Sequence, residues 1–66
     1  MKAEWRLESL MNEHKFFLGD KLVIHIFKAN GLWQGHVLGL AKTFSDKSLD
    51  NVIKKAERGA KDCGWF

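Results

Sequence analysis

The stretch that decides the fold is KLVIHIFKANGLWQGHVLGL, residues 21–40. Its first part, Lys21–Lys28, is rich in β-branched and aromatic residues, which is typical of a β-strand. Asn30 and Gly31 follow, and this pair readily adopts the two positive φ angles of a type I′ turn. Leu32–Leu40 then forms a returning strand. The stretch therefore predicts an antiparallel β-hairpin closed by a two-residue loop.

A two-residue loop fixes the register of the hairpin and with it the two faces. His25 is expected opposite His36, and Phe27 opposite Gln34. One face is mainly aliphatic, with glycines that would let another element approach closely, and carries Leu22, Ile24, Ile26, Trp33, Gly35, Val37 and Gly39. The other face is mixed and carries Val23, His25, Phe27, Leu32, Gln34, His36 and Leu38. We expect a helix to cover the aliphatic face.

The C-terminal third of the chain predicts that helix. Its apolar residues recur at helical spacing within a narrow arc: Leu49, Val52, Ile53, Ala56, Ala60 and Cys63. Ser45, Asp46 and Ser48 are candidate N-caps, and Gly64 suits the position after the C-cap. Gly59 lies inside the helix and weakens it by about 1 kcal/mol relative to Ala, which close packing would explain. Cys63 is expected to be a buried thiol.

The N-terminal third fits two structures. Good helix propensity favours a helix over residues 3–13 followed by a short strand at Phe16–Leu18, whereas alternation of side chains favours a strand over residues 3–11. The fold class predicted is α+β, as one small domain over residues 1–66. It has an antiparallel sheet of about three strands around the Asn-Gly hairpin, a C-terminal amphipathic helix on one face, and an N-terminal helix or edge strand.

Length and composition limit the classes of protein to which this chain can belong. A chain of 66 residues has a small core, and its single Cys leaves no internal disulfide and no Cys pair for a structural zinc site, so a homodimer is a possible source of stability. No apolar run is long enough to span a membrane, and charge returns too early near Met1 for a signal peptide. A lone Cys without an export signal predicts a cytoplasmic setting.

A row of basic residues on the predicted helix is the first candidate site. The net charge is +3, and the row could track the phosphates of a nucleic acid, although many helices carry such a solvated face. The residues predicted to bind nucleic acid are Lys47, Lys54, Lys55, Arg58 and Lys61.

The mixed face of the hairpin is the second candidate site. Its central residues, His25, Phe27, Gln34 and His36, could bind a partner or stack on bases. The two histidines are close enough to share a transition metal, and His14 could supply the missing third ligand if the N-terminal segment lies alongside. Two half-exposed histidines on a solvated face are the simpler interpretation. We predict no metal and no cofactor.

The aromatic ending Trp65-Phe66 is the third candidate. These residues either fold back to complete the core, with Trp5 as a possible contact, or form a docking tip for a partner. Nothing in the sequence suggests a nucleophile, a paired acid and base or a phosphate loop, so we predict a binding protein and not an enzyme.

The layout of hairpin and helix is similar in outline to two kinds of small domain. With Leu32-Trp33-Gln34 on the second strand and Ser48-Leu49-Asp50 opening the helix, it resembles arm-type DNA-binding domains of integrases and compact phage-encoded inhibitors. Fold-level similarity transfers no site residues. The sequence therefore predicts a small nucleic-acid-associated protein, with a protein-interaction module or inhibitor of a larger enzyme, of phage or mobile-element origin, as the alternative.

Overall fold

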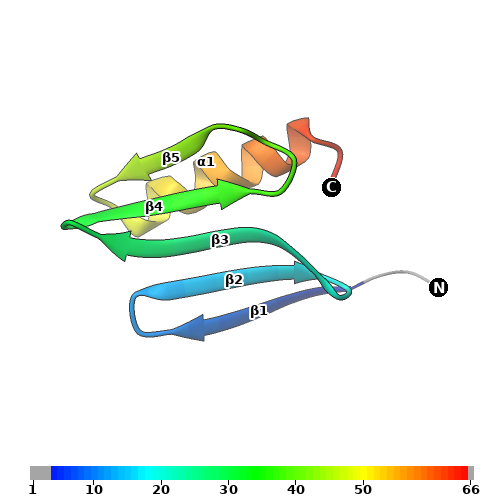
Figure 1. Ribbon diagram of the computed structural model, residues 1–66, viewed down its shortest axis with the longest axis horizontal. Coiled ribbons are helices and arrows are strands. Elements are labelled where there is room, and N and C mark those ends of the chain that lie inside the picture. Colours follow the sequence, from blue (N-terminus) through cyan, green and yellow to red (C-terminus); the bar gives the residue numbers. More distant parts are fainter. Residues whose placement is uncertain (1–3, 66) are drawn as a thin grey trace.

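The protein is a five-stranded antiparallel sheet followed by one helix, as seen in a computed structural model that describes residues 4–65. The strands lie in the sheet in the order of the sequence (Figure 1). Their bounds are β1 Trp5–Leu10, β2 Glu13–Leu18, β3 Lys21–Ala29, β4 Leu32–Val37 and β5 Thr43–Asp46, and the helix α1 spans Leu49–Asp62. Each strand therefore pairs only with its neighbours along the chain.

The central hairpin of β3 and β4 has the predicted register. His25 lies opposite His36 and Phe27 opposite Gln34. Asn30 and Gly31 have φ angles of 55° and 76°, as a type I′ turn requires. The local signal of an Asn-Gly pair between two β-branched runs was therefore sufficient to place this hairpin.

The prediction of about three strands with an N-terminal helix is wrong. Residues 5–18 form a hairpin, β1 and β2, whose register runs without a shift from Trp5 opposite Leu18 to Leu10 opposite Glu13. Asn12 in the intervening turn has a φ of 62°. Helix propensity is a weak preference, and β2 finds a partner in β3 that satisfies its backbone groups. The alternative of a strand over residues 3–11 lies close to the observed β1.

The strand β5 was also not predicted from the sequence. β5 has only four residues, Thr43–Asp46, too few to show a clear alternation of apolar and polar side chains. It pairs with β4, placing Phe44 opposite Gly35 and Asp46 opposite Trp33. Along the sequence, β5 therefore connects the central hairpin to the start of α1.

A β-bulge in β3 changes the expected faces of the sheet. Phe16 pairs with Ile24 but Phe17 pairs with Leu22, so Val23 is the extra residue. Leu22 therefore shares the face of Phe17 and not that of Ile24, contrary to the simple alternation. Val23 and Ile24 are each only 1% exposed, so two successive residues of β3 are buried.

The helix α1 begins and ends where the sequence indicated. Ser48 is the N-cap residue, although its side chain makes no capping hydrogen bond. At the other end, the backbone N–H groups of Gly64 and Trp65 donate to the carbonyls of Lys61 and Ala60, which forms a Schellman motif with Gly64 at a φ of 85°. The prediction of a buried Cys63 is wrong, because this residue is the C-cap and its side chain is exposed.

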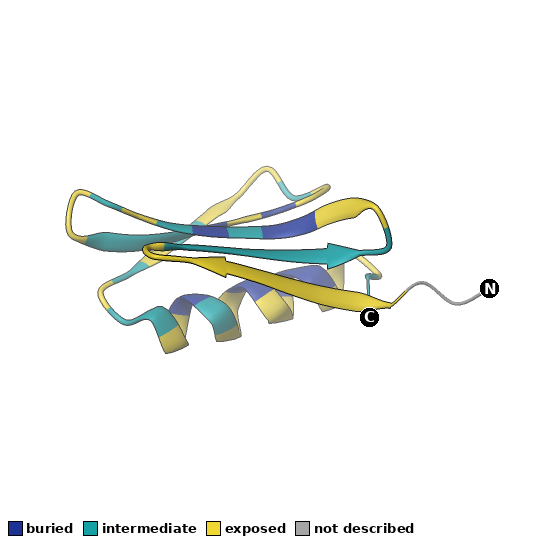
Figure 2. Cartoon of the chain, turned by 90° about the horizontal axis from the view of Figure 1, so that it is seen from below, coloured by how far each residue is buried: buried dark blue, intermediate teal, exposed yellow. Residues whose placement is uncertain are grey.

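The helix covers one part of the sheet only. It packs on β3, β4 and β5, and the buried core lies between these elements and comprises Val23, Ile24, Ile26, Val37, Val52, Ala56 and Ala60. Two glycines allow this close packing. A Cβ atom at Gly35 would lie 3.0 Å from Val52 Cγ1, and one at Gly59 would lie 3.0 Å from Leu40 Cδ2. Figure 2 shows the helix on one side of the sheet and β1 exposed along its length.

Candidate nucleic-acid interface

The outer side of α1 carries three basic residues that line one shallow depression together with Glu57. These residues, Lys54, Arg58 and Lys61, come from successive turns of the helix. Over residues 4–65, the ion pairs of the structure involve other cations, so no carboxylate lies within 4.0 Å of these three charged groups. The arrangement leaves their positive charges available to an anionic partner.

Lys55, a fourth predicted residue, is held differently. Its Nζ lies 3.5 Å from Asp46 Oδ2. Asp46 Oδ1 also accepts hydrogen bonds from the Ser48 backbone N–H at 2.8 Å and from Asn51 at 3.3 Å. These hydrogen bonds, that of Ser48 foremost, hold the pKa of Asp46 below its usual range, with a further contribution from Lys55. The charge of Lys55 is thus partly balanced. Lys47, the fifth predicted residue, precedes the helix and is exposed.

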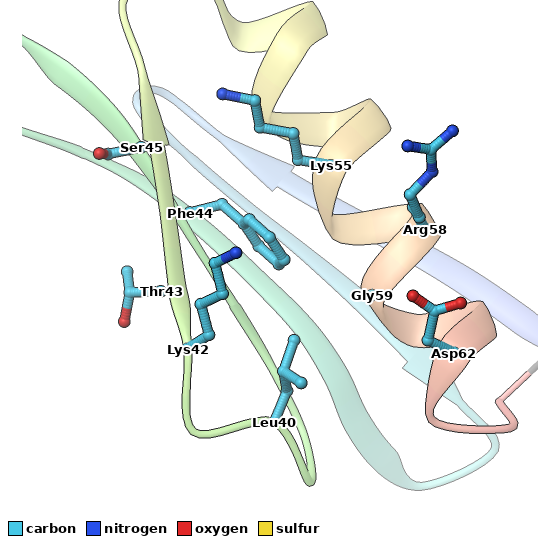
Figure 3. Close-up of a pocket in the computed structure, with 9 residues that line it drawn as sticks. All are labelled: Leu40, Lys42, Thr43, Phe44, Ser45, Lys55, Arg58, Gly59 and Asp62. Carbon is cyan, nitrogen blue, oxygen red and sulfur yellow. The ribbon is translucent and has the colours of Figure 1, made fainter.

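A groove lies between β5 and α1 (Figure 3), and it brings in a cation that the sequence analysis did not single out. Lys42 lies just before β5, and its Nζ is 5.5 Å from the centre of the Phe44 ring. Arg58 lines both this groove and the outer depression. The groove also contains one carboxylate, that of Asp62. The complete lining is Leu40, Lys42, Thr43, Phe44, Ser45, Lys55, Arg58, Gly59 and Asp62.

Lys42 was missed because its position depends on β5. Without that strand, residues 40–46 read as a loop, and nothing in a loop sequence indicates which side chains will face a helix that begins at Leu49. The only available signal was the short spacing between Lys42 and Phe44, which on an extended segment places both side chains on one face.

The opposite face of the sheet brings together the four residues predicted there. Phe27 stacks on His36 with ring centres 5.7 Å apart and an interplanar angle of 7°, and His25 lies 5.2 Å from Phe27 in a tilted arrangement. Gln34 faces Phe27 across the strand pair. His25 Nε2 lies 3.1 Å from Glu13 Oε2, within hydrogen-bonding distance, and this contact, assisted by Lys15, lowers the pKa of Glu13. A carboxylate at its edge makes this face less suitable for phosphate groups.

The structure separates His14 from the other two histidines. Its Nδ1 lies 2.8 Å from Ser9 Oγ, and its ring lies 5.7 Å from that of Trp33. In β2, His14 alternates with Glu13 and Lys15, which share the face of His25. Among the described residues, no group of three or more potential ligands could hold a metal ion.

Trp65 folds back onto the body of the protein. Its indole Nε1 donates a hydrogen bond of 2.9 Å to the carbonyl of Leu38, its ring lies 5.7 Å from Lys21 Nζ, and the residue packs against the buried core. This is the first of the two arrangements considered for the aromatic ending. Phe66 lies outside the described residues.

Comparison with family models, curated proteins and solved structures gave no match for this chain. Within residues 4–65, no helix combines the length and the hydrophobicity needed to cross a membrane. The geometry of the described residues is therefore the basis for a functional proposal.

Proposed function

We propose that this protein binds nucleic acid through a basic surface made by α1 and the segment before β5. The basic surface comprises Lys42, Lys54, Lys55, Arg58 and Lys61. The single observation that carries the proposal is the position of Arg58, which joins the outer row of cations on α1 to the groove beside Phe44. Cations from two elements thus lie along one continuous side of the molecule.

Phosphate groups are the part of a nucleic acid that this surface fits. Successive basic residues on one helix side lie about 5–6 Å apart, a spacing at which long flexible side chains can reach neighbouring phosphates. Lys54, Arg58 and Lys61 have no ion pair with any of residues 4–65 to break before binding, whereas Lys55 would have to leave Asp46. We therefore propose that the first three and Lys42 contribute most of the affinity, with little dependence on base sequence.

The test is fluorescence anisotropy with a labelled 20-base-pair duplex, a 20-nucleotide DNA strand and the equivalent RNA strand, each at 50 and 200 mM salt. The variant Lys54→Gln/Lys61→Gln removes two charges from the basic surface, and Lys15→Gln/Lys28→Gln removes two from β2 and β3. We expect binding that weakens with salt. The salt slope should fall by about one for each phosphate that the first variant no longer neutralises, and should not change in the second. Absence of binding at 50 mM salt, or equally weakened binding in both variants, would contradict the proposal.

A protein-interaction module or inhibitor is the second candidate function. The observation that favours it is the exposure of apolar side chains in the hairpin of β1 and β2, where Leu7 is 55% exposed, Leu10 69% and Met11 90%. Replacing Leu7, Leu10 and Met11 with Ala should abolish capture of a protein partner while leaving nucleic-acid binding unchanged.

A further inference from the structure

The edge strand β1 has the features of a strand that pairs with another strand. All six of its residues are exposed, its register with β2 is unbroken, and the sequence WRLESL contains neither Pro nor Lys. Natural proteins commonly protect an open edge with Pro, with charged side chains, Lys above all, with a bulge or with a covering element. The two charged residues of β1, Arg6 and Glu8, are of opposite sign and pair with each other. The opposite edge, β5, has only four residues and lies beside α1. The two edges therefore differ in their capacity for further pairing.

At every second residue of β1, the backbone N–H and C=O groups point outward from the open edge of the sheet. The N–H of Gly19 donates to the carbonyl of Glu4, opposite it in the register of the hairpin. In an antiparallel pair such hydrogen-bonded positions alternate with positions whose N–H and C=O groups point outward. The backbone groups of Arg6 and Glu8 therefore point toward β2, and those of Leu7 and Ser9 point outward from the edge.

We propose that two copies of this chain associate by antiparallel pairing of their β1 strands, about a two-fold axis at Leu7 perpendicular to the sheet. The inference is independent of the proposed nucleic-acid binding. In this register Leu7 lies opposite its own copy, with their outward backbone groups exchanging hydrogen bonds. Because the axis is perpendicular to the sheet, both helices lie on the same side of one continuous sheet, with β1 and β2 of both copies between them.

Charge complementarity favours this register over the two adjacent ones. Arg6 and Glu8 lie on one face of β1, and their side chains form an ion pair, with 3.1 Å between Arg6 Nη2 and Glu8 Oε2. An axis at Leu7 places Arg6 opposite Glu8 of the second copy, twice, so that four charges alternate in sign. An axis at Arg6 or at Glu8 would instead place two like charges opposite each other, which is destabilising.

The apolar face of the hairpin is continuous across the proposed junction. Leu7 is 55% exposed and has Phe16 opposite it on β2. Phe16 packs against the buried core. Contact between the two copies of Leu7 would extend that apolar layer across the axis. The area is small compared with a standard interface, so we expect a dimer that forms only as concentration rises.

The test is sedimentation equilibrium of the whole chain from about 5 to 500 µM, a range that covers weak association. We expect a mass that rises from one copy to two and no further. Arg6→Glu and Glu8→Arg each place like charges across the axis and should each weaken the dimer about tenfold or more. Arg58→Glu is the control for Arg6→Glu, because it makes the same change of charge on α1, away from β1. It should leave the association unchanged.

Mixing the two β1 variants decides the matter. Arg6→Glu presents Glu at both positions, and Glu8→Arg presents Arg at both, so an equimolar mixture restores every opposite-charge pair and should form a heterodimer. Circular dichroism of each variant controls for folding, since Arg6 also lies over the Phe17 ring at 4.7 Å. A single-copy mass at every concentration, masses above two copies, or failure of the mixture to associate would each overturn the proposal.

Discussion

β1 and β4 are both six-residue strands with large apolar side chains, yet their environments are opposite. Every residue of β1 is exposed, whereas Gly35 and Val37 of β4 are buried. The difference arises because β4 has a strand on each side and α1 above it, while β1 pairs with one strand, β2, within residues 4–65. The comparison teaches that burial in this protein depends on the helix layer. The sheet has a covered half, β3–β5 with α1, and an uncovered half, β1 and β2.

The largest expected effect is a truncation in the covered half. Ile26 is fully buried, so Ile26→Ala should lower the free energy of unfolding by about 2–5 kcal/mol through reduced burial and a cavity. Leu7→Ala in the uncovered half should change it by less than about 1 kcal/mol, since that side chain is 55% exposed. Urea unfolding followed by tryptophan fluorescence measures both. Equal effects would show that the hairpin of β1 and β2 is covered in solution.

The next effect concerns how closely the helix approaches the sheet. A Cβ atom at Gly35 would lie 3.0 Å from Val52 Cγ1, so Gly35→Ala should cost about 1–3 kcal/mol by overpacking. Val52 is completely buried and β-branched, which limits its ability to move aside. Gly31→Asn is the control: nothing lies within 4 Å of a Cβ there, and Asn tolerates a positive φ. If thermal melts showed a smaller loss of stability for Gly35→Ala than for Gly31→Asn, the close approach of helix and sheet would be contradicted.

Amide hydrogen exchange should resolve the two halves without any substitution. Amides that bond β3 to β4 should exchange only through global unfolding, whereas those of Arg6 and Glu8, which point toward β2, should open at least about 1 kcal/mol more easily. The outward amides of Leu7 and Ser9 should exchange fastest in dilute protein. Slowing of these two with rising concentration is expected from the proposed pairing of β1. Uniform protection across all strands would remove the distinction between the halves.

The smallest effect is on the dependence of stability on pH. The pKa of Asp46 is lowered, mainly by the Ser48 N–H, and that of Glu13 is lowered, mainly by His25. A carboxyl whose pKa is lower in the folded state stabilises the protein fully above its ordinary pKa, 3.8 for Asp46 and 4.5 for Glu13, and this is lost as pH falls through the folded-state pKa.

Asp46→Asn and Glu13→Gln should therefore each flatten the fall in urea midpoint between pH 6 and pH 2. One substitution removes a titrating carboxylate at the start of α1, in the covered half, and the other removes a titrating carboxylate of β2 that contacts β3. Because the two groups lie on separate elements, the double variant should flatten the curve by the sum of the two changes. An unchanged curve in Asp46→Asn would show that its hydrogen bonds do not form in solution.

What the sequence could predict was limited to features with a local cause. Asn30-Gly31 specified its turn, the apolar arc specified α1, and Gly64 specified the end of that helix. The pairing of His25 with His36 followed from the loop length. The partner of His25, Glu13, did not, because it depends on β2 lying beside β3, and residues 3–13 are also good helix formers.

The candidate site was predicted in part for the same reason. Lys54, Arg58 and Lys61 follow from the helical period, and the structure places them together. Lys42 joins them only through β5, a strand too short to recognise. The β-bulge at Val23 gave no sequence signal, and Leu22 was therefore assigned to the wrong face. Each of these misses reflects an interaction between elements and not a local preference.

The order of the strands, which follows the sequence throughout, has a consequence for the kinetics of folding. Each strand can pair as soon as the one before it is in place, so few distant segments must meet and the loops that close are short. We therefore expect folding in milliseconds or less, faster than is usual for sheets with distant pairings. Since α1 follows all five strands, a ribosome releases it after them. The apolar side of the sheet therefore remains exposed to solvent until the helix has been synthesised.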